Sequence, residues 1–459
     1  MKKILFLLVI ALLPLGGCVS MDTGPRQASI SLKHTRVPGL PQLSLLLALR
    51  ENIASSVKLD LADVEILAGE RWISLLDSQP LTLSAEKIGN NQRFINRLSV
   101  PPGNYKRLRF TFANADHKAK PIIKEQPLIP AMTLHRDDSV CLFLTWDAAI
   151  TQQGRIGNTP AIRAIVKPIP LTTELAFISC PDIDTIYIVR TDTNRICGSW
   201  GVSGHPTYLS VSKSRNELIV LAPEQNKIKI IELSSGRLKD TINLPMIRMP
   251  TFMVVGNNDR FAFLLDRQSD YLSKIDLQSG LLVNRVRVIE QPGFLAMADD
   301  DTLVLSSELS QKVVFISTDN LQVTQSVSDG GGPKGLLVHD KYLYIAEYKA
   351  NDVARYNLNT AEIERHPVGL GPTRILSYND HIYISNDRSN TVSILLPGQT
   401  GVARNLRVGV NPAEMAVSSS RNWLYIANKT GLTVLDTTSQ RLTTNIDLRT
   451  DPQDIAIIQ

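Results

Sequence analysis

Residues 412–437 read PAEMAVSSSRNWLYIANKTGLTVLDT, and the fold prediction starts from this stretch. Pro412, which opens the stretch, is followed three and five positions later by the apolar residues Met415 and Val417. Two further apolar runs, 424–428 and 432–437, come after short polar segments. Short apolar runs bounded by turn residues are typical of β-strands, and period-two spacing gives the first strand one buried face. The stretch therefore predicts three short strands in succession.

The same pattern recurs through the second half of the chain. Prolines are spaced by 44, 42, 41, 39, 40 and 40 residues, at Pro206, Pro250, Pro292, Pro333, Pro372, Pro412 and Pro452. Apolar residues follow each proline at the same offsets in nearly every copy, and a fourth strand is predicted to lead to the next proline. Four short strands per repeat of about 40 residues are typical of a β-propeller blade.

The number of blades follows from how the repeat begins and ends. Pro452 starts a first strand, but the chain stops at Gln459. The strands that would complete this blade are predicted upstream of Pro206, at 176–180, 186–191 and 195–202. Six whole blades and one split blade predict a seven-bladed β-propeller over residues 174–459, closed by the C-terminal strand. Such closure removes open sheet edges.

The repeats resemble the YVTN family of β-propellers. Residues 424–428, LYIAN, together with Leu435-Asp436-Thr437 fit the family pattern closely, and 185–202 fit its second half. Other blades depart from it, with Glu232, Ser317, Asn357 and Leu396 where the family favours aspartate. The resemblance covers about 285 residues. It implies the fold but no particular function, because propellers serve binding, scaffolding and catalysis alike.

Residues 29–168 alternate with period two and predict a β-sandwich domain. We expect strands at 43–50, 57–67, 71–76, 97–100, 105–113, 140–146 and 162–166. The stretch 43–52 also fits a short helix. The fold class predicted for the whole chain is thus all-β, a sandwich followed by a propeller.

The sandwich region resembles an uncharacterised domain family found at the N-terminus of bacterial envelope lipoproteins. Three pieces carry the resemblance: a strand pair around Trp72, a proline-glycine turn leading to Tyr105 and a basic strand, and a late strand ending at Asp147 before a Gly-Asn turn. The family carries no known catalytic residues, so the resemblance assigns none here.

The N-terminus has the features of an export signal. Lys2 and Lys3 precede an apolar stretch, 4–15, which as a helix would rise only about 18 Å and is too short to span a bilayer. The following Leu15-Gly16-Gly17-Cys18 resembles the bacterial lipobox. An ordinary signal peptide with a chance cysteine is the alternative.

The lipobox resemblance implies a signal peptide over 1–17, cleavage before Cys18, palmitate or similar lipid on that cysteine, and a tether over 18–28. Val19 and Ser20 follow the cysteine where inner-membrane lipoproteins often carry aspartate. We therefore expect a lipid-anchored protein of the bacterial cell envelope, at the periplasmic side of the outer membrane or on its surface, with the membrane as one partner.

The sequence shows no recognisable catalytic or metal motif. The remaining cysteines, Cys141, Cys180 and Cys197, form no C-x-x-C pair, and no two histidines stand three or four residues apart. Free thiols are expected, with a bridge from Cys141 to Cys180 or Cys197 as the alternative. The net charge of +5, from 49 basic and 44 acidic residues, does not favour a nucleic-acid partner. No cofactor or metal is predicted.

The candidate binding residues come from the geometry of a propeller, in which the first strand of each blade is innermost. Residues two positions after each blade proline should ring one mouth of the central channel: Tyr208, Phe252, Phe294, Gly335, Arg374, Glu414 and Asp454, with Lys334 beside Gly335. Aromatic residues fall on one side and charged residues on the other, an arrangement suited to gripping a ligand or a partner's loop. Local packing of these positions is the alternative.

Two functions are compatible with these patterns. The first is an envelope lipoprotein that binds or scaffolds a protein or glycan partner through the propeller disc. The second is an envelope enzyme of lyase or oxidoreductase type that uses Arg374, Glu414 and Asp454 with a bound metal, because neighbouring carboxylates work as acid and base or bind Ca²⁺.

Overall fold

The computed structural model describes residues 36–51, 56–77, 79–113, 120–153, 161–167, 169, 173–328, 330–396, 399 and 401–458. The predicted signal peptide, Cys18 and the tether lie outside these residues. Within them, no helix is both long and apolar enough to cross a membrane.

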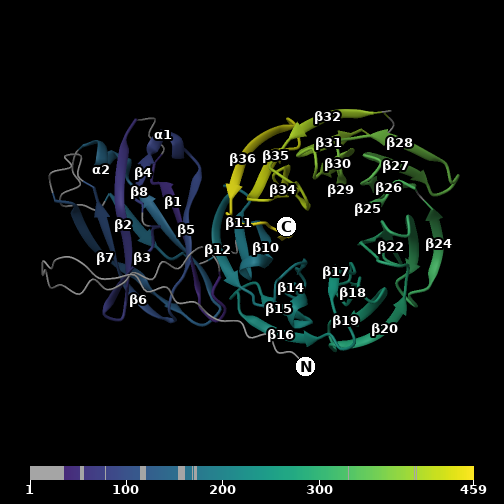
Figure 1. Ribbon diagram of the computed structural model, residues 1–459, viewed down its shortest axis with the longest axis horizontal. Helices are drawn as coiled ribbons and strands as arrows, with labels where there is room; N and C mark the ends of the chain where they lie inside the picture. Colours follow the sequence, from purple (N-terminus) through teal and green to yellow (C-terminus); the bar gives the residue numbers. More distant parts are fainter. Residues whose placement is uncertain are drawn as a thin grey trace, which may run out of the picture. The chain divides into compact units, whose positions relative to one another are not determined.

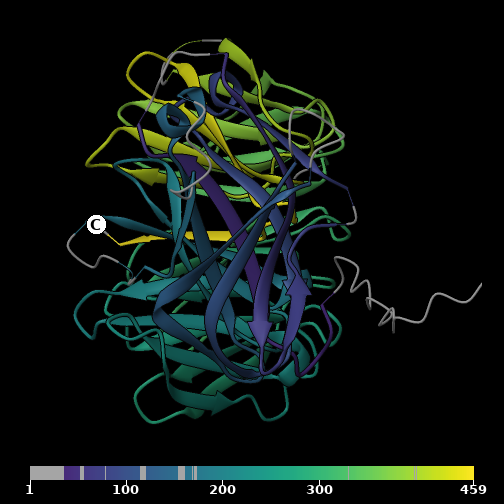
Figure 2. The same ribbon diagram turned by 90° about the vertical axis from the view of Figure 1, so that its left-hand side faces the viewer.

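The first region contains two sheets. One has the order β5-β1-β8-β9, from β5 (Gln92–Ser99), β1 (Gln42–Leu49), β8 (Ser139–Trp146) and β9 (Ile162–Ile165). The other has the order β3-β2-β6-β7, from β3 (Arg71–Ser74), β2 (Lys58–Ala68), β6 (Gly103–Phe112) and β7 (Ile122–Leu134), with β4 (Leu81–Ser84) also paired to β2. Figure 2 shows these strands side by side, in purple and blue. Two short helices, α1 (Ala85–Ile88) and α2 (Ala148–Gln152), complete the region.

Period-two alternation builds the core between these two sheets. In β2, Leu59 and Leu61 are buried while Lys58 and Asp60 are exposed. Side chains from both sheets, among them Phe110 and Trp146, share one apolar cluster. The helix alternative for 43–52 is wrong, because this segment pairs as β1 with β5 on one side and β8 on the other.

The second region consists of seven four-stranded antiparallel sheets around a common axis (Figure 1). Blade 1 is β13 (Leu209–Ser212), β14 (Glu217–Ala222), β15 (Lys227–Glu232) and β16 (Leu238–Asn243); blade 2 is β17 (Pro250–Val255), β18 (Phe261–Asp266), β19 (Tyr271–Asp276) and β20 (Leu281–Arg287); blade 3 is β21 (Phe294–Met297), β22 (Thr302–Ser307), β23 (Lys312–Ser317) and β24 (Val323–Ser328).

The remaining blades have the same order from axis to rim. Blade 4 is β25 (Pro333–His339), β26 (Tyr342–Glu347), β27 (Asp352–Asn357) and β28 (Ile363–Pro367); blade 5 is β29 (Pro372–Tyr378), β30 (His381–Asn386), β31 (Thr391–Leu395) and β32 (Val402–Arg407); blade 6 is β33 (Met415–Ser418), β34 (Trp423–Asn428), β35 (Gly431–Asp436) and β36 (Arg441–Asp447); blade 7 is β37 (Asp454–Ile458), β10 (Leu175–Cys180), β11 (Thr185–Arg190) and β12 (Arg195–Gly201).

The predicted closure of the ring is confirmed. The C-terminal strand β37 pairs antiparallel with β10, with Leu175 opposite Ile458 and Ser179 opposite Asp454. Blade 7 is therefore built from both ends of the repeat region, and its innermost strand is the last of the chain.

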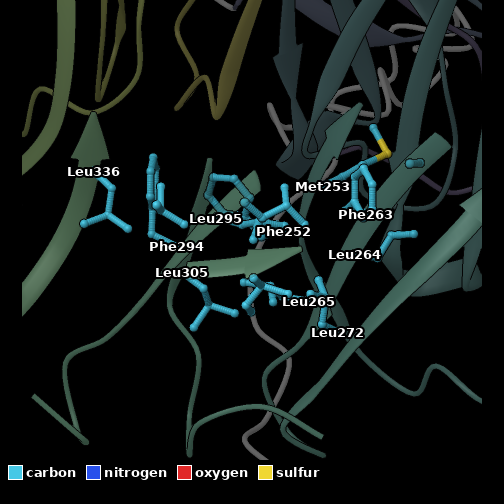
Figure 3. Packing of buried hydrophobic residues seen from close by; sticks show 14 of the residues in the cluster. Phe252, Met253, Phe263, Leu264, Leu265, Leu272, Phe294, Leu295, Leu305 and Leu336 are labelled. Carbon is cyan, nitrogen blue, oxygen red and sulfur yellow. The ribbon is translucent and has the colours of Figure 1, made fainter. Parts of the chain in front are cut away.

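The blades are held together by side chains packed between neighbouring sheets. The second strands are buried on both faces, so they read as continuous apolar runs rather than alternating ones; Leu264, Leu265 and Leu305 are examples (Figure 3). The outer strands are more exposed, as Leu238 and Leu281 show. Burial therefore falls from the middle of each blade to its rim.

The sandwich packs against blade 7 through a buried interface. Leu46, Phe94 and Phe143 share an apolar cluster with blade residues such as Tyr187. The buried Arg97 adds polar contacts: its Nη1 donates to the backbone oxygen of Leu448 at 3.2 Å, and its Nη2 donates to that of Arg449 at 3.1 Å. The two regions thus share this interface cluster, which is distinct from the cluster that forms the core of the sandwich. The predicted domain bounds, 29–168 and 174–459, stay predictions.

Candidate binding face of the propeller

We call one end of the ring the proline face, because each inner strand begins there at or after its blade proline. The loops that join the second and third strands of the blades meet the inter-blade loops on this face. Backbone hydrogen bonds repeat this contact: Tyr348 N donates to Gly332 O at 3.0 Å, and Asp387 N donates to Gly371 O at 2.9 Å. The face is therefore built from fourteen loops with a regular arrangement, two for each of seven blades.

Three of the predicted mouth residues form an aromatic row. The ring centroids of Tyr208 and Phe252 are 4.2 Å apart, and those of Phe252 and Phe294 are 4.8 Å apart. Each side chain is less than a tenth exposed. Phe252 and Phe294 come from the inner strands of blades 2 and 3 (Figure 3), and Tyr208 directly precedes the inner strand of blade 1, so neighbouring blades place the three rings side by side.

Arg374 crosses the axis from blade 5 to this aromatic row. Its Cζ lies 4.8 Å from the ring centroid of Phe294 and 5.8 Å from that of Phe252. Blades 5 and 2 are three positions apart in a ring of seven, so a contact between them has to span the axis. The Nε of Arg374 also donates to Glu414 Oε2 at 2.8 Å, which pairs the guanidinium with the next blade. The axis at this level is therefore occupied by the protein's own side chains.

Asp454 joins blade 7 to blade 1. Its Oδ2 accepts a hydrogen bond from Leu209 N at 2.7 Å, and its Oδ1 accepts one from Ile455 N at 2.8 Å. Its own N–H donates to Ser179 Oγ at 3.0 Å. Burial raises the pKa of Asp454 to about 7, and the nearby carboxylate of Glu414 adds to the effect. Asp454, which the sequence predicts at the mouth of the channel, thus links the last strand of the ring to the first blade.

We expect Asp454→Asn to remove a pH dependence of stability. The folded-state pKa is raised above the ordinary 3.8, so this group's stabilising contribution is fully present below about pH 4 and is lost as the pH rises through about 7. The free energy of unfolding of the wild type, relative to the variant, should fall by up to about 4 kcal/mol across this range. Urea unfolding of both proteins at several pH values measures the difference, and parallel profiles would contradict the expectation.

Blade 4 contributes no side chain to the axial cluster, because it carries Gly335 at the equivalent position. A Cβ on Gly335 would lie 2.5 Å from the backbone oxygen of Thr373 and 2.9 Å from the Cα of Arg374. Both contacts are with backbone, which has little freedom to move aside. Glycine therefore lets the inner strand of blade 4 approach that of blade 5.

Lys334 lies apart from the axial cluster, in a second group on the proline face. Its Nζ is 3.1 Å from the ring centroid of Tyr348, and the Cζ of Arg388 is 4.6 Å from the same centroid. Arg388 Nη2 donates to the backbone oxygen of Tyr348 at 2.7 Å. Burial lowers the pKa of Lys334. The sequence interpretation placed Lys334 with the mouth and did not find Tyr348 or Arg388. Both lie in loops that follow second strands, Tyr348 one residue after β26 and Arg388 two residues after β30, and this loop position is the signal that points to them.

The three cysteines of the described residues are buried free thiols. Burial raises the pKa of Cys141 and of Cys197 to about 12. Because all three thiols are free, the structure does not contain the disulfide from Cys141 to Cys180 or Cys197 that was the alternative expectation. Among the described residues, no group of three or more histidine, cysteine, aspartate or glutamate side chains is placed to hold a metal ion.

Comparison with known proteins supports the fold alone. No family model and no curated protein matches the chain. A functionally unknown protein from Desulfotomaculum acetoxidans is 13% identical, with a TM-score of 0.55 over 62% of this chain and 99% of its own. A candidate 6-phosphogluconolactonase from Bacteroides fragilis is 14% identical, with a TM-score of 0.52 over 64% of this chain and all of its own. With the seven sheets described above, these likenesses define the chain as a β-propeller protein.

Proposed function

We propose that this chain is a lipid-anchored protein of the bacterial envelope that works as a non-enzymatic binding or scaffolding module. One observation carries the proposal: the charged residues at the axis are already bound by partners within the protein. Arg374 is bound by Glu414 and two aromatic rings, and both oxygens of Asp454 are bound by backbone N–H groups. Catalytic groups need an open position for a substrate, and here the side chains occupy it.

The joint between the sandwich and blade 7 supports a scaffolding role. Because Arg97 and the shared apolar cluster fix the sandwich to the ring, the surfaces of both regions keep one mutual orientation. The resemblance of the repeats to the YVTN family, and of the sandwich to a lipoprotein domain family, is consistent with this proposal. The expected partner is a protein or a glycan.

The lipid anchor is tested on Cys18. We expect metabolic labelling with a palmitate analogue to mark the wild-type protein in a bacterial host, and Cys18→Ser to abolish the label. Cys141→Ser is the matched control, since that thiol is buried and should leave labelling unchanged. Equal labelling of the wild type and Cys18→Ser would refute the anchor.

The binding role is tested by photo-crosslinking in intact envelopes. A photoreactive residue is placed at Lys213 or Lys341, in exposed turns at the end opposite the proline face, or at the exposed Leu370 on the proline face. We expect a discrete adduct from one face only. Adducts from neither face, together with turnover of a substrate that Glu414→Gln abolishes, would favour the enzyme instead. The raised pKa of Asp454 is the observation that keeps the enzyme reading as the second candidate.

A further inference from the structure

A groove opens at the rim of the ring between blades 1 and 2, where β16 and β20 lie next to each other (Figure 1). Its volume is about 600 Å³, and it is lined by the outer strand of blade 1 and by the turn before the outer strand of blade 2. Leu281 lines the groove, and Met246 directly follows its lining residue Pro245; these two side chains are 65% and 68% exposed. The groove thus combines open polar backbone with exposed apolar side chains.

The corresponding groove between blades 6 and 7 already holds a polypeptide turn. Residues 90–92 of the sandwich lie there, and about 220 Å³ of space remains. Both amide atoms of Gln92 bind one residue of the outer strand: Nε2 donates to Ile196 O at 3.1 Å, and Ile196 N donates to Oε1 at 3.0 Å. Arg195 donates to the backbone oxygen of Asn90. The protein itself therefore shows what such a groove binds.

Strand register shows that the two grooves are equivalent. Ile196 pairs with Val189, and Leu282 pairs with Ile275, in each case beside the register shift between the third strand and the outer strand. The N–H and C=O of Ile196 both bond Gln92, which lies outside the sheet. The same groups of Leu282 therefore lie on the open edge of β20, where an amide or an extended backbone can pair with them.

Neighbouring grooves are bridged by the protein's own side chains. Asn284 of blade 2 donates from Nδ2 to a backbone oxygen of blade 3 at 3.0 Å, and Gln325 of blade 3 donates from Nε2 to Tyr356 Oη of blade 4 at 3.4 Å. Asp240 is at the same register position in blade 1. Its Oδ1 accepts from Thr241 N at 2.7 Å, and a carboxylate has no N–H to donate across the groove.

We propose that the groove between blades 1 and 2 binds an exposed turn of a partner protein, in the way that the groove between blades 6 and 7 holds residues 90–92. An amide side chain of the turn would pair with the backbone N–H and C=O of Leu282, as Gln92 does with Ile196. The inference narrows the proposed partner to a protein, and it rests on the proposed function in that respect only.

Residue differences between the two grooves predict the chemistry of the turn. Leu281 is at the position that Arg195 has in blade 7. The partner should therefore carry an apolar residue where the sandwich has Asn90. Asp240 is at the position of Thr444, whose hydroxyl donates to the sandwich at 3.4 Å. The partner should therefore present an N–H donor to this carboxylate.

The test uses the chain from residue 19 onward, which contains every described residue, and two cyclic peptides. One has the sequence of residues 87–95, KIGNNQRFI, and the other is the same peptide with Asn90→Leu. Binding is followed by the NMR shifts of the methyl groups of Leu281 and Met246. We expect the Asn90→Leu peptide to bind about fivefold more tightly, because its added apolar side chain is buried. Gln92→Ala in either peptide should lower the affinity at least about tenfold, since two hydrogen bonds are lost.

Matched variants of the protein test the groove itself. Leu281→Arg should reverse the preference between the peptides, because it supplies the guanidinium that Arg195 has in blade 7. Asp240→Asn should weaken the binding of both, because the new amide can bridge the groove as that of Asn284 does. Gln322→Arg, an exposed change at the start of the outer strand of blade 3, is the control and should change nothing. Thermal unfolding of each variant confirms that it is folded.

Two results would overturn the proposal: no methyl shift with either peptide at millimolar concentration, or equal effects of Leu281→Arg and Gln322→Arg. In intact envelopes, a photoreactive residue at position 281 should crosslink to a turn of a different protein. A crosslink to a second copy of this chain or to a glycan would also overturn it. Absence of peptide binding with Cys18 still labelled by palmitate refutes only the groove. Peptide binding together with turnover that Glu414→Gln abolishes refutes only the proposed function.

Discussion

Replacing Arg374 by methionine is expected to destabilise the protein by about 3–5 kcal/mol, because it removes the cation from a mostly buried group of charges. Glu414 would lose its 2.8 Å partner, and the adjacent Asp454 would lose the nearby positive charge. The aromatic row would also lose the guanidinium that lies against Phe252 and Phe294. Urea unfolding at neutral pH measures the change.

A second substitution distinguishes the charge effect from a loss of packing. Glu414→Gln in the Arg374→Met background removes the stranded carboxylate, and we expect it to recover part of the lost stability. If the double variant is less stable than Arg374→Met by the full cost of Glu414→Gln alone, the two side chains act independently and the proposed axial pair is wrong.

Ending the chain at Asp451 is expected to have a still larger effect. The truncation removes β37, with the buried Ile455 and the hydrogen bonds of Asp454 to Leu209 and Ser179. Loss of one buried isoleucine alone costs about 2–5 kcal/mol. It also leaves β10 as an open edge, which favours association between chains. We expect lower solubility and a Tm reduced by many degrees.

Adding the missing strand back as a separate peptide provides the control. A synthetic peptide of residues 450–459 should restore part of the Tm if β37 is needed as a strand of blade 7. Scrambling the peptide should abolish the recovery, because the register between Leu175 and Ile458 and between Ser179 and Asp454 depends on its order. A truncated protein as stable as the full chain would refute the closure mechanism.

Much of the fold is predictable because the repeat imposes regular constraints. Pro206 to Pro452 mark the start of each inner strand, and the continuous apolar runs identify the strands buried on both faces. The strands β4 and β7 were not predicted; in β7, Pro127 and Pro130 interrupt the alternating pattern. Prolines are tolerated there because β7 is at the edge of its sheet.

The candidate site was harder to predict than the fold. The strand pattern tells at which end of the ring a residue lies, but it does not tell where the side chain of that residue points. Sequence placed Tyr208, Phe252, Phe294, Arg374, Glu414 and Asp454 at one end of the axis, and the structure brings them together there. That Arg374 spans the axis depends on distances between blades that no local pattern contains. Lys334 was predicted with the mouth residues because it precedes Gly335 in the sequence. In the structure its ammonium group lies against the ring of Tyr348, in the loop that follows β26. Whether these residues bind a ligand stays a prediction.

The split blade has a consequence for how the chain matures. During synthesis, β10, β11 and β12 emerge more than 250 residues before β37 does. Blade 7 consequently lacks its innermost strand while the six other blades are synthesised. The sandwich, already made by then, covers the outer side of that blade, but its inner edge stays open until β37 is made. Ring closure therefore depends on residues 454–458, and a chain interrupted before β37 leaves β10 as an open sheet edge.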